Sequence, residues 1–338
     1  MDNSTLGRSG IAVSRLILGC GNFGGIGSAP AFFGRGTAKA EAFMIMDAAW
    51  DAGITTFDTA DAYGGGRSET YIGEWLATKS PAVAESLVIA TKTFNPMDDR
   101  ADCGLRPERI ARQLESSLRR LGVERVAMYL AHEFDPTVPL AETQGAFEIL
   151  QRAGKVAAFG ASNFSDTQLR DALASAAQHQ QPRYEWVQNS FSLLEQGERA
   201  TILAQCRDQG LGYTPFSPLA GGWLTGKYGR DQPIPANSRM SMRPEPYEGY
   251  RDRRVFDALD VLRRVSTELG RSMASVALSW LLAQPGVTAI VIGPNTVAHL
   301  APILDSVDAK LTPQTVDLLT QTFVDARSSA ALPETESR

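Results

Sequence analysis

The stretch from residue 126 to residue 159, VAMYLAHEFDPTVPLAETQGAFEILQRAGKVAAF, predicts a strand, a helix and a second strand in succession. Val126–Leu130 and Val156–Phe159 are short apolar runs of the kind that form buried strands. Between them, Pro139 is suited to open a helix and Gly154 to follow its end. Two neighbouring strands joined by a helical crossover run parallel. The stretch therefore predicts one β-α-β unit of a parallel sheet.

The same alternation continues along the rest of the chain. Eight short apolar runs resemble strands, namely Leu16–Leu18, Thr55–Phe57, Leu87–Ala90, Val126–Leu130, Val156–Phe159, Glu185–Val187, Gly212–Phe216 and Ala289–Ile292. Segments with helical periodicity separate them, and Ser165 with Gln168 has the spacing of a capping box at the start of one such helix. Eight strand–helix units predict an α/β fold, a closed (β/α)8 TIM barrel. An open doubly wound sheet is the alternative.

Two segments lie outside this eightfold pattern. Residues 4–13 predict a hairpin that turns at Arg8-Ser9-Gly10 and covers the floor of the barrel. A long loop rich in glycine and proline follows Phe216 and ends near Arg251, and an extra helix is expected around residues 254–269. Loops of this length are usually functional or disordered. We expect a single barrel domain over residues 1–338, in which residues 328–338 form a disordered tail.

The composition limits the classes of function. The chain has 338 residues, of which 43% are hydrophobic, and its formal net charge is −5. This mild acidity argues against nucleic acid or an anionic membrane surface as a partner. We see no signal peptide and no apolar stretch of about 18 residues that could span a bilayer. The three cysteines, Cys20, Cys103 and Cys206, lie far apart and predict reduced thiols in a cytoplasmic protein.

One motif is misleading. Residues 19–24, GCGNFG, match the pattern G-x-G-x-x-G after a predicted strand. In a dinucleotide-binding Rossmann fold a helix must open at once, so that its N-terminus meets the pyrophosphate. Here helical periodicity begins only near Ala38. We therefore interpret the segment as a glycine-rich loop over the mouth of the barrel, and we expect residues 25–36 to form a lid.

Four polar side chains follow consecutive predicted strands. Asp58 and Tyr63 come after the second strand, Lys92 after the third and His132 after the fourth. Chemistry in such barrels takes place at the C-terminal ends of the strands, so we expect these four groups to meet at one mouth. Gathering several ionisable groups in one place is costly unless they are paired or solvated. The set is therefore the candidate catalytic site.

Together these groups suit general acid catalysis. The unperturbed pKa of tyrosine is about 10, and a lysine cation within about 4–6 Å would lower the pKa of Tyr63. Asp58 would keep Lys92 charged, and Tyr63 would then donate a proton near neutral pH. His132 would orient a carbonyl oxygen on which negative charge develops. We find no Ser or Cys nucleophile with a base and no metal-ligand pattern, and we expect no metal.

The motif at residues 57–64, FDTADAYG, together with Lys92 and His132, resembles the signature of the aldo-keto reductase family. The resemblance covers nearly the whole chain, from the N-terminal hairpin to the last helix. It implies a barrel that binds NADP(H) across its mouth and reduces aldehydes or ketones to alcohols. It also implies Tyr63 as the proton donor, Lys92 and Asp58 as the groups that tune it, and His132 as the group that orients the substrate.

The resemblance also implies a set of cofactor contacts. Residues after the fifth and sixth strands would hold the nicotinamide carboxamide, Phe216 would stack on its ring, and the loop that follows would clasp the pyrophosphate through glycines that allow close backbone approach. A segment after the eighth strand would lie beside the adenosine phosphate. The implied contacts are Gly21, Asn22, Asp58, Ser162, Asn163, Gln188, Phe216, Ser217, Pro218, Leu219, Gly221, Gly222, Lys227, Gly293 and Asn295.

Two positions depart from the family pattern. Phe216 stands where the family often has tyrosine, but stacking needs only the ring. Asn295 stands where many members carry a basic residue against the 2′-phosphate, and no Lys or Arg occurs from Gly293 to Ser306. An arginine of the long loop, Arg239 or Arg243, could take that role. NADP(H) is thus favoured by the resemblance, and NAD(H) stays possible.

Three functions remain open at this point. The first is NAD(P)H-dependent reduction of a small carbonyl compound. The second is a nicotinamide-binding regulatory subunit that resembles potassium-channel β subunits. The third is an isomerase or aldolase with Lys92 as a Schiff base, which a charged lysine beside Asp58 disfavours. Aromatic residues of the loops would suit an apolar or sugar-like substrate, namely Phe23, Phe32, Phe33, Phe94, Phe134 and Trp223. The physiological substrate and the oligomeric state are not predicted.

Overall fold

The computed structural model describes residues 1–98 and 102–328 of the chain. Its contacts divide the chain into two compact units. Unit 1 consists of Met1–Asn189, Arg199–Phe216 and Gly286–Leu300, and unit 2 of Ser190–Glu198, Ser217–Pro285 and the chain from Ala301 onward. The units are described separately, and the single domain over residues 1–338 stays a prediction.

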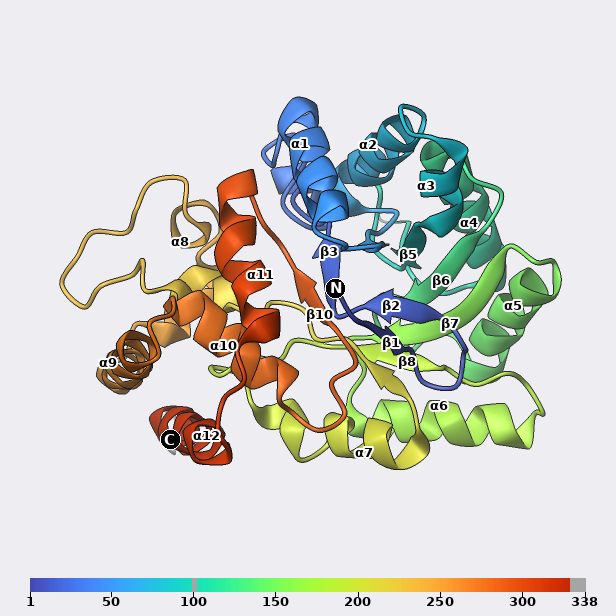
Figure 1. Ribbon diagram of the computed structural model, residues 1–338. Helices are drawn as coiled ribbons and strands as arrows, with labels where there is room; N and C mark the ends of the chain where they lie inside the picture. Colours follow the sequence, from blue (N-terminus) through green and yellow to red (C-terminus); the bar gives the residue numbers. More distant parts are fainter. Residues whose placement is uncertain (99–101, 329–338) are drawn as a thin grey trace, which may run out of the picture. The chain divides into compact units, whose positions relative to one another are not determined.

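Unit 1 contains a sheet of eight parallel strands that confirms the predicted (β/α)8 barrel (Figure 1). Its strand order is β10-β3-β4-β5-β6-β7-β8-β9, so chain neighbours are also spatial neighbours. Two backbone hydrogen bonds join the edges, from Val291 N to Pro215 O and from Thr288 N to Tyr213 O, both at 2.9 Å. The sheet thereby closes on itself. The strands are β3 (Leu16–Gly19), β4 (Thr56–Asp58), β5 (Val88–Thr93), β6 (Val126–Ala131), β7 (Val156–Ser162), β8 (Trp186–Gln188), β9 (Gly212–Tyr213) and β10 (Ile290–Ile292).

All eight predicted strands are present, and one is shorter than expected. The run Gly212–Phe216 forms a regular strand only to Tyr213. Pro215 has no N–H to donate, which interrupts the ladder. The residues beyond β9 still bond to the neighbouring chain segment, through Thr214 N to Val187 O and Phe216 N to Asn189 O, both at 3.0 Å.

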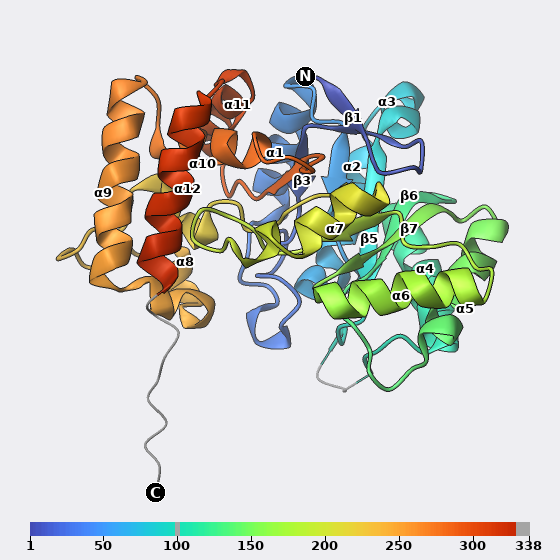
Figure 2. The same cartoon turned by 90° about the horizontal axis from the view of Figure 1, so that it is seen from below.

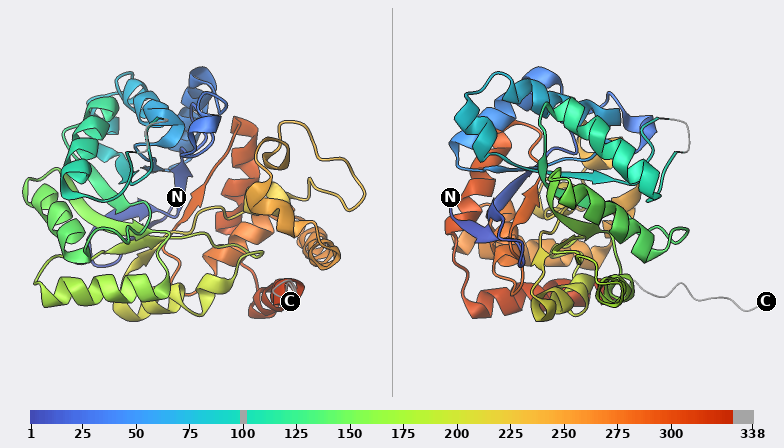
Figure 3. Two further views of the ribbon diagram at one scale, coloured as in Figure 1. Left: turned by 180° about the vertical axis from the view of Figure 1, so that it is seen from behind. Right: turned by 90° about the vertical axis from the view of Figure 1, so that its right-hand side faces the viewer.

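Helices lie on the outer face of this sheet (Figures 1 and 3). Pro139 directly precedes α5 and Gly154 follows its end with φ 73°, as predicted. The predicted capping box is present, because Ser165 accepts from Gln168 N and the Gln168 side chain accepts from Ser165 N. The helices of unit 1 are α1 (Lys39–Asp51), α2 (Arg67–Leu76), α3 (Pro81–Ser86), α4 (Pro107–Leu121), α5 (Leu140–Arg152), α6 (Asp166–Gln178) and α7 (Ile202–Gln209), with 3-10 turns η1 (Pro30–Phe32), η2 (Tyr63–Gly66) and η6 (Val297–His299).

A two-stranded hairpin, β1 (Asn3–Thr5) and β2 (Ala12–Ser14), covers the end of the barrel at which the strands begin (Figure 3). Leu6 and Val13 are buried in one core cluster with interior residues of the barrel such as Met128 and Trp186. Gly7 has φ 54°, and a Cβ at this position would lie 2.3 Å from Glu185 O. Only glycine fits at position 7, so the backbone of the hairpin packs directly against the start of β8. The hairpin therefore covers the floor of the barrel, as predicted from the sequence.

Unit 2 is built around helices. α9 (Arg253–Glu268) confirms the predicted extra helix and packs against α12 (Pro313–Ser328), as Figure 2 shows, and against α10 (Met273–Leu282). The long loop after Phe216 carries short helical turns, η4 (Ala220–Thr225), α8 (Arg239–Met242) and η5 (Glu245–Tyr250). The remaining elements are α11 (Leu300–Asp308), whose first residue belongs to unit 1, and the turn η3 (Gly197–Arg199). The predicted tail lies outside the described residues beyond Ser328, where α12 ends.

Two further sequence expectations can be compared with the described residues. Cys20, Cys103 and Cys206 are free thiols. Over residues 1–98 and 102–328, none of the helices has both the length and the apolar character needed to cross a membrane.

Candidate active site

The four predicted catalytic side chains meet at the C-terminal ends of neighbouring strands of unit 1. Asp58 is the last residue of β4, Lys92 lies near the end of β5, and His132 directly follows β6. Tyr63 opens the turn η2 in the loop after β4. The register places Asp58 opposite Ala90 and Lys92 opposite Leu130, so successive strands present these groups at similar heights.

Lys92 is the centre of this set. Its ammonium donates hydrogen bonds to Asp58 Oδ1 at 2.5 Å, to the Thr59 carbonyl oxygen at 2.9 Å and to Tyr63 Oη at 3.1 Å. Its side chain is fully buried and that of Asp58 is 3% exposed. Burial opposes the charge, but Asp58 and Tyr63 outweigh it and raise the pKa of Lys92. Lys92 is therefore a charged ammonium at neutral pH.

The second carboxylate oxygen of Asp58 also has a partner. Asp58 Oδ2 accepts from Gln188 Nε2 at 2.9 Å. Gln188 comes from β8, so one carboxylate connects opposite sides of the barrel interior. Asp58 is thereby held by two donors, and its orientation toward Lys92 is fixed.

The pKa of Tyr63 differs from the sequence-based expectation. Burial of the phenol raises its pKa above the ordinary value of 10.0, and Lys92 offsets only part of this effect. The expectation of a lowered pKa was wrong, because it counted the lysine charge and omitted the cost of burying a phenolate. Tyr63 is consequently protonated throughout the physiological pH range, which is the state that a proton donor requires.

His132 lies beside Tyr63 as a neutral ring. The two ring centroids are 5.5 Å apart with an interplanar angle of 78°. Burial, and then the Lys92 charge, hold the pKa of His132 well below its usual value. Within the part of the chain that the structure describes, its Nδ1 has no hydrogen-bond partner although it is buried. The neutral ring beside the phenol can donate one N–H hydrogen bond to a substrate oxygen.

Comparisons with known proteins agree with this geometry. The sequence model of the Aldo/keto reductase family matches residues 15–322. This chain belongs to that family. It is 37% identical over 332 residues to "Uncharacterized oxidoreductase YrpG" of Bacillus subtilis, covering 96% of each chain. It is 32% identical to a probable voltage-gated potassium channel subunit beta of Oryza sativa, covering 94% of this chain and 95% of the relative, and 30% identical to the L-glyceraldehyde 3-phosphate reductase of Escherichia coli, covering 87% and 84%.

Aldo/keto reductases use nicotinamide cofactors. Ser162, the last residue of β7, and Asn163, which follows it, are the residues predicted to contact the carboxamide of such a cofactor. Both could instead have been helix caps, but Ser165 caps α6. Asn163 has φ 57° and donates through Nδ2 to the His132 carbonyl oxygen at 2.9 Å. Asn163 Nδ2 also lies 3.2 Å from Ser162 Oγ, so both side chains lie beside His132.

Two glycine-rich segments predicted to contact the cofactor also lie together in unit 1. Asn22 Nδ2 donates to Asn295 Oδ1 at 2.6 Å. A Cβ on Gly21 would lie 3.5 Å from the Tyr63 ring, and a Cβ on Gly293 3.9 Å from Asn22 Nδ2. The loop after β3 is thus joined to the segment after β10 and borders Tyr63. Its next α-helix starts only at Lys39, so rejecting a Rossmann turn was correct.

The predicted pyrophosphate loop belongs to unit 2, apart from Phe216, the last residue of its stretch of unit 1. Ser217 and Ala220 have φ of 53° and 47°, and Gly221 and Gly222 continue the left-handed run. Gly222 has φ 94°, a conformation that favours glycine, and a Cβ there would lie 2.2 Å from Lys227 Cε. Pro218 is buried and Leu219 half-buried in the same turn.

Two cations of unit 2, Lys227 and Arg239, have lowered pKa values. Burial and the neighbouring Arg239 lower the pKa of Lys227. Burial also lowers the pKa of Arg239, as does Arg243. Lys227, Arg239 and Arg243 therefore lie close enough for their charges to act on one another. These are the two arginines that the sequence offered as substitutes for a basic residue at position 295.

Two of the predicted substrate-lining aromatic residues do not line the mouth. Phe23 is fully buried in unit 1. Trp223 is fully buried in unit 2, where it packs on Tyr228, Tyr250 and Phe256 with ring centroids 5.0–5.9 Å apart. Sequence position in a loop did not reveal that these large rings serve as core. Partly exposed are Phe32, Phe33, Phe94 and Phe134.

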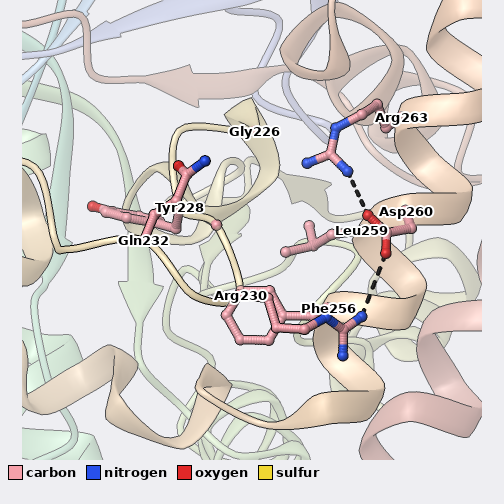
Figure 4. A pocket seen from close by; sticks show the side chains of 9 residues that line it. Gly226, Tyr228, Arg230, Gln232, Phe256, Leu259, Asp260 and Arg263 are labelled. Atoms are coloured by element: carbon pink, nitrogen blue, oxygen red, sulfur yellow. Dashed lines mark hydrogen bonds and ion pairs between the residues drawn. The ribbon is translucent and has the colours of Figure 1, made fainter.

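A hollow in unit 2 carries no comparable chemistry (Figure 4). Arg230 NH2 lies 2.8 Å from Asp257 Oδ1 and 3.4 Å from Asp260 Oδ2, and its guanidinium lies 5.5 Å from the Phe256 ring centroid. Arg263 pairs with the same Asp260. The charges that line this hollow are paired with one another, which is typical of a surface ion-pair network.

Sequence reasoning missed the buried charges behind the catalytic residues. Asp61 lies inside the motif at residues 57–64, but no role was predicted for it. Arg109 lies on a helix that was predicted from the spacing of its apolar residues only. Both are fully buried. A charged residue among the buried positions of an amphipathic helix is the signal that could have marked Arg109, because such groups are rarely buried without a partner.

Proposed function

We propose that this protein is an NADPH-dependent reductase of small aldehydes or ketones, with Tyr63 as the proton donor. The observation that carries the proposal is the hydrogen-bonded chain from buried Asp58 through buried Lys92 to half-buried Tyr63, with separations of 2.5 and 3.1 Å. A phenol that touches a charged ammonium can release its proton and still be stabilised. Membership of the Aldo/keto reductase family supports the same reaction class.

The chain's own residues would act on the carbonyl oxygen. When bound, the reduced nicotinamide supplies the hydride. The Tyr63 O–H gives its proton to the substrate oxygen as negative charge builds there. The resulting phenolate lies 3.1 Å from the Lys92 ammonium, which Asp58 holds in place. Neutral His132 offers a ring nitrogen that can fix the orientation of the same oxygen.

The residues present fit a nicotinamide cofactor. Ser162, Asn163 and Gln188 lie around the catalytic groups in unit 1, and the left-handed backbone of residues 220–222 in unit 2 leaves amides close to Lys227. We assign the carboxamide to the first three residues and the pyrophosphate to the second segment. Lys227 would neutralise charge on the pyrophosphate, and Arg239 or Arg243 would hold the 2′-phosphate, since cations suit this group and Asn295 offers none.

The proposed phosphate role of Arg239 gives a test of cofactor preference. A charge-assisted hydrogen bond is worth about 1.5–3 kcal/mol, so Arg239→Gln should weaken NADPH binding roughly 10- to 100-fold and leave NADH binding nearly unchanged. Quenching of protein fluorescence by each nucleotide measures both dissociation constants. Arg230→Gln, which removes a surface cation paired with Asp257, is the matched control. Equal affinity of the unaltered protein for NADPH and NADH would contradict the preference.

A nicotinamide-binding regulatory subunit is the second candidate, and the 32% identity to the Oryza sativa channel subunit favours it. A complete set of catalytic groups is compatible with that role. The discriminating experiment follows the absorbance of reduced nicotinamide over a panel of aldehydes, ketones and keto-sugars. Sustained consumption supports a reductase. No consumption with any carbonyl, together with tight nucleotide binding and capture of a membrane-protein partner, would favour the subunit.

A Schiff-base isomerase or aldolase fits the site poorly. Lys92 is paired with Asp58 and its pKa is raised, whereas an amine nucleophile must be neutral. Borohydride trapping of a carbonyl substrate on Lys92 would reverse this conclusion. The cytoplasmic location expected from the sequence stays a prediction.

A further inference from the structure

A second set of buried polar groups lies behind β5, on the face away from the barrel interior. Successive strand residues point to opposite faces, so Thr91 and Thr93 point away from the face that presents Lys92. Thr91 Oγ1 donates to Glu69 Oε1 at 2.5 Å, and Thr93 Oγ1 donates to Asp61 Oδ2 at 2.7 Å. Both threonines are fully buried. Two carboxylates therefore meet the back of the strand that carries the catalytic lysine.

Thr93 connects this set to the catalytic groups. Its hydroxyl oxygen accepts from Arg109 NH1 at 2.8 Å, so its own proton is free to point to Asp61. Its carbonyl oxygen accepts from the His132 N–H at 3.0 Å. Thr93 thus joins the end of β5 to the residue that orients the substrate.

Asp61 makes the complementary connection. Its N–H donates to the Lys92 carbonyl oxygen at 3.0 Å, and two residues later the chain reaches Tyr63. The side-chain hydrogen bond between Asp61 and Thr93 therefore ties together two residues whose backbones bond to Lys92 and His132. Neither Asp61 nor Thr93 needs to touch a substrate to affect their relative placement.

We propose that Asp61, acting through Thr93 and Arg109, is a positioning residue that keeps Tyr63, Lys92 and His132 in their catalytic arrangement, and that its ionisation adjusts this arrangement. The proposal rests on the reductase function for its kinetic consequences only. Its structural part concerns the protein without nucleotide.

The charges around Asp61 come from every element packed on it. Glu69 comes from α2, Arg109 and Arg120 from α4, and Tyr129 from β6. Glu69 pairs with Arg120 at 2.7 Å, so its charge is matched directly, whereas Asp61 reaches Arg109 only through the Thr93 hydroxyl. Among the described residues, Asp61 Oδ1 has no hydrogen-bond partner.

Burial, followed by the neighbouring Glu69, raises the pKa of Asp61 to about 7. The value of Asp61 in the unfolded chain is near 3.8, so between these pH values the folded state holds a proton that the unfolded state has lost. The contribution of Asp61 to the free energy of unfolding is therefore largest at low pH, and it falls as pH rises toward 7. An ionised Asp61 at pH 8 opposes folding, which is acceptable where a charge serves function.

Asp61→Asn separates positioning from stability. We expect kcat for carbonyl reduction to fall at least tenfold, with the NADPH dissociation constant changed less than twofold. We also expect Tm at pH 8 to stay equal or rise, because the costly charge is gone. Asp208→Asn, an exposed carboxylate of α7, is the matched control and should change neither kcat nor Tm.

Two variants of Thr93 test the hydroxyl that bonds to Asp61. Thr93→Ser keeps this hydroxyl and should retain most of kcat, whereas Thr93→Val removes the hydroxyl and should lose most of kcat.

Histidine NMR provides a readout that needs no activity. The chain has three histidines, so ring signals from His132, His179 and His299 can be assigned by single substitutions. In the nucleotide-free protein, the ring signal of His132 should shift with an inflection near pH 7 that reports Asp61. This inflection should be absent from Asp61→Asn. The ring signal of the exposed His179 should be unaffected by Asp61→Asn.

The outcomes distinguish this inference from the proposed function. If the protein reduces no carbonyl but the His132 inflection depends on Asp61, the reductase proposal fails and the positioning role stands. If Asp61→Asn keeps full kcat, or if the inflection persists in Asp61→Asn or is missing from the unaltered protein, the positioning role is overturned.

Discussion

Tyr63→Phe should lower kcat for carbonyl reduction by about 10²- to 10⁴-fold, the usual contribution of a positioned general acid. The substitution removes only the hydroxyl that lies 3.1 Å from Lys92 Nζ. Lys92 keeps its hydrogen bonds to Asp58 and to the Thr59 carbonyl oxygen, so the buried charge remains paired. Nucleotide binding should be unchanged, because the proposed cofactor contacts do not include this hydroxyl.

Steady-state kinetics with the best carbonyl substrate, together with nucleotide titration, would measure both effects. Tyr71→Phe, a half-buried tyrosine on α2, is the matched control and should be fully active. Tyr63→Phe with undiminished turnover would show that another group supplies the proton. A parallel loss of nucleotide affinity would mean that the ring hydroxyl acts in binding.

The burial of Tyr63 also predicts the form of the pH profile. Since the pKa of the phenol is raised by burial, the donor stays protonated well into the alkaline range. His132 stays neutral across the same range, because its pKa is far below its usual value. We therefore attribute a change in rate near pH 7 to Asp61, whose pKa is raised to about 7.

The fold could be predicted well because its signals are local. Each strand is a short apolar run and each helix has its own periodicity, so the repeated alternation identified the barrel without long-range information. Ser165 and Gln168 even fixed a helix start, since a capping box involves residues only three apart. The error at Gly212–Phe216 has the same origin, because apolar character suggested a strand that the backbone of Pro215 interrupts.

The catalytic residues could be predicted because the strand ends of a barrel converge, which turns positions along the chain into positions in space. Their energetics could not. The pKa of Tyr63 depends on how completely the phenol is buried, and this depends on packing from Gly21 and other distant residues. The contact between Arg109 and Thr93 could not be predicted for the same reason, because Arg109 was placed on its helix by apolar pattern alone and Thr93 lies beyond the predicted strand Leu87–Ala90.

The ion pair of Lys92 and Asp58 gives the largest expected effect on stability. Removing one member of a buried pair leaves an uncompensated charge, which typically costs about 3–5 kcal/mol. Lys92→Met and Asp58→Asn should each lower the free energy of unfolding by about this amount. Each substitution should also abolish most turnover. Lys92→Met removes the cation beside Tyr63, and Asp58→Asn removes the carboxylate that holds this cation in place.

The double variant Lys92→Met/Asp58→Asn separates the two roles of this pair. Neither charge remains, and the amide oxygen introduced at position 58 can still accept from Gln188, so the double variant should be nearly as stable as the unaltered protein. Turnover should stay lost, since no cation stabilises the phenolate form of Tyr63. Denaturant unfolding of all four proteins gives the coupling free energy. If the double variant were as unstable as the sum of the single ones, the pair would act independently on stability. If it regained turnover, the ammonium would not be what allows Tyr63 to release its proton.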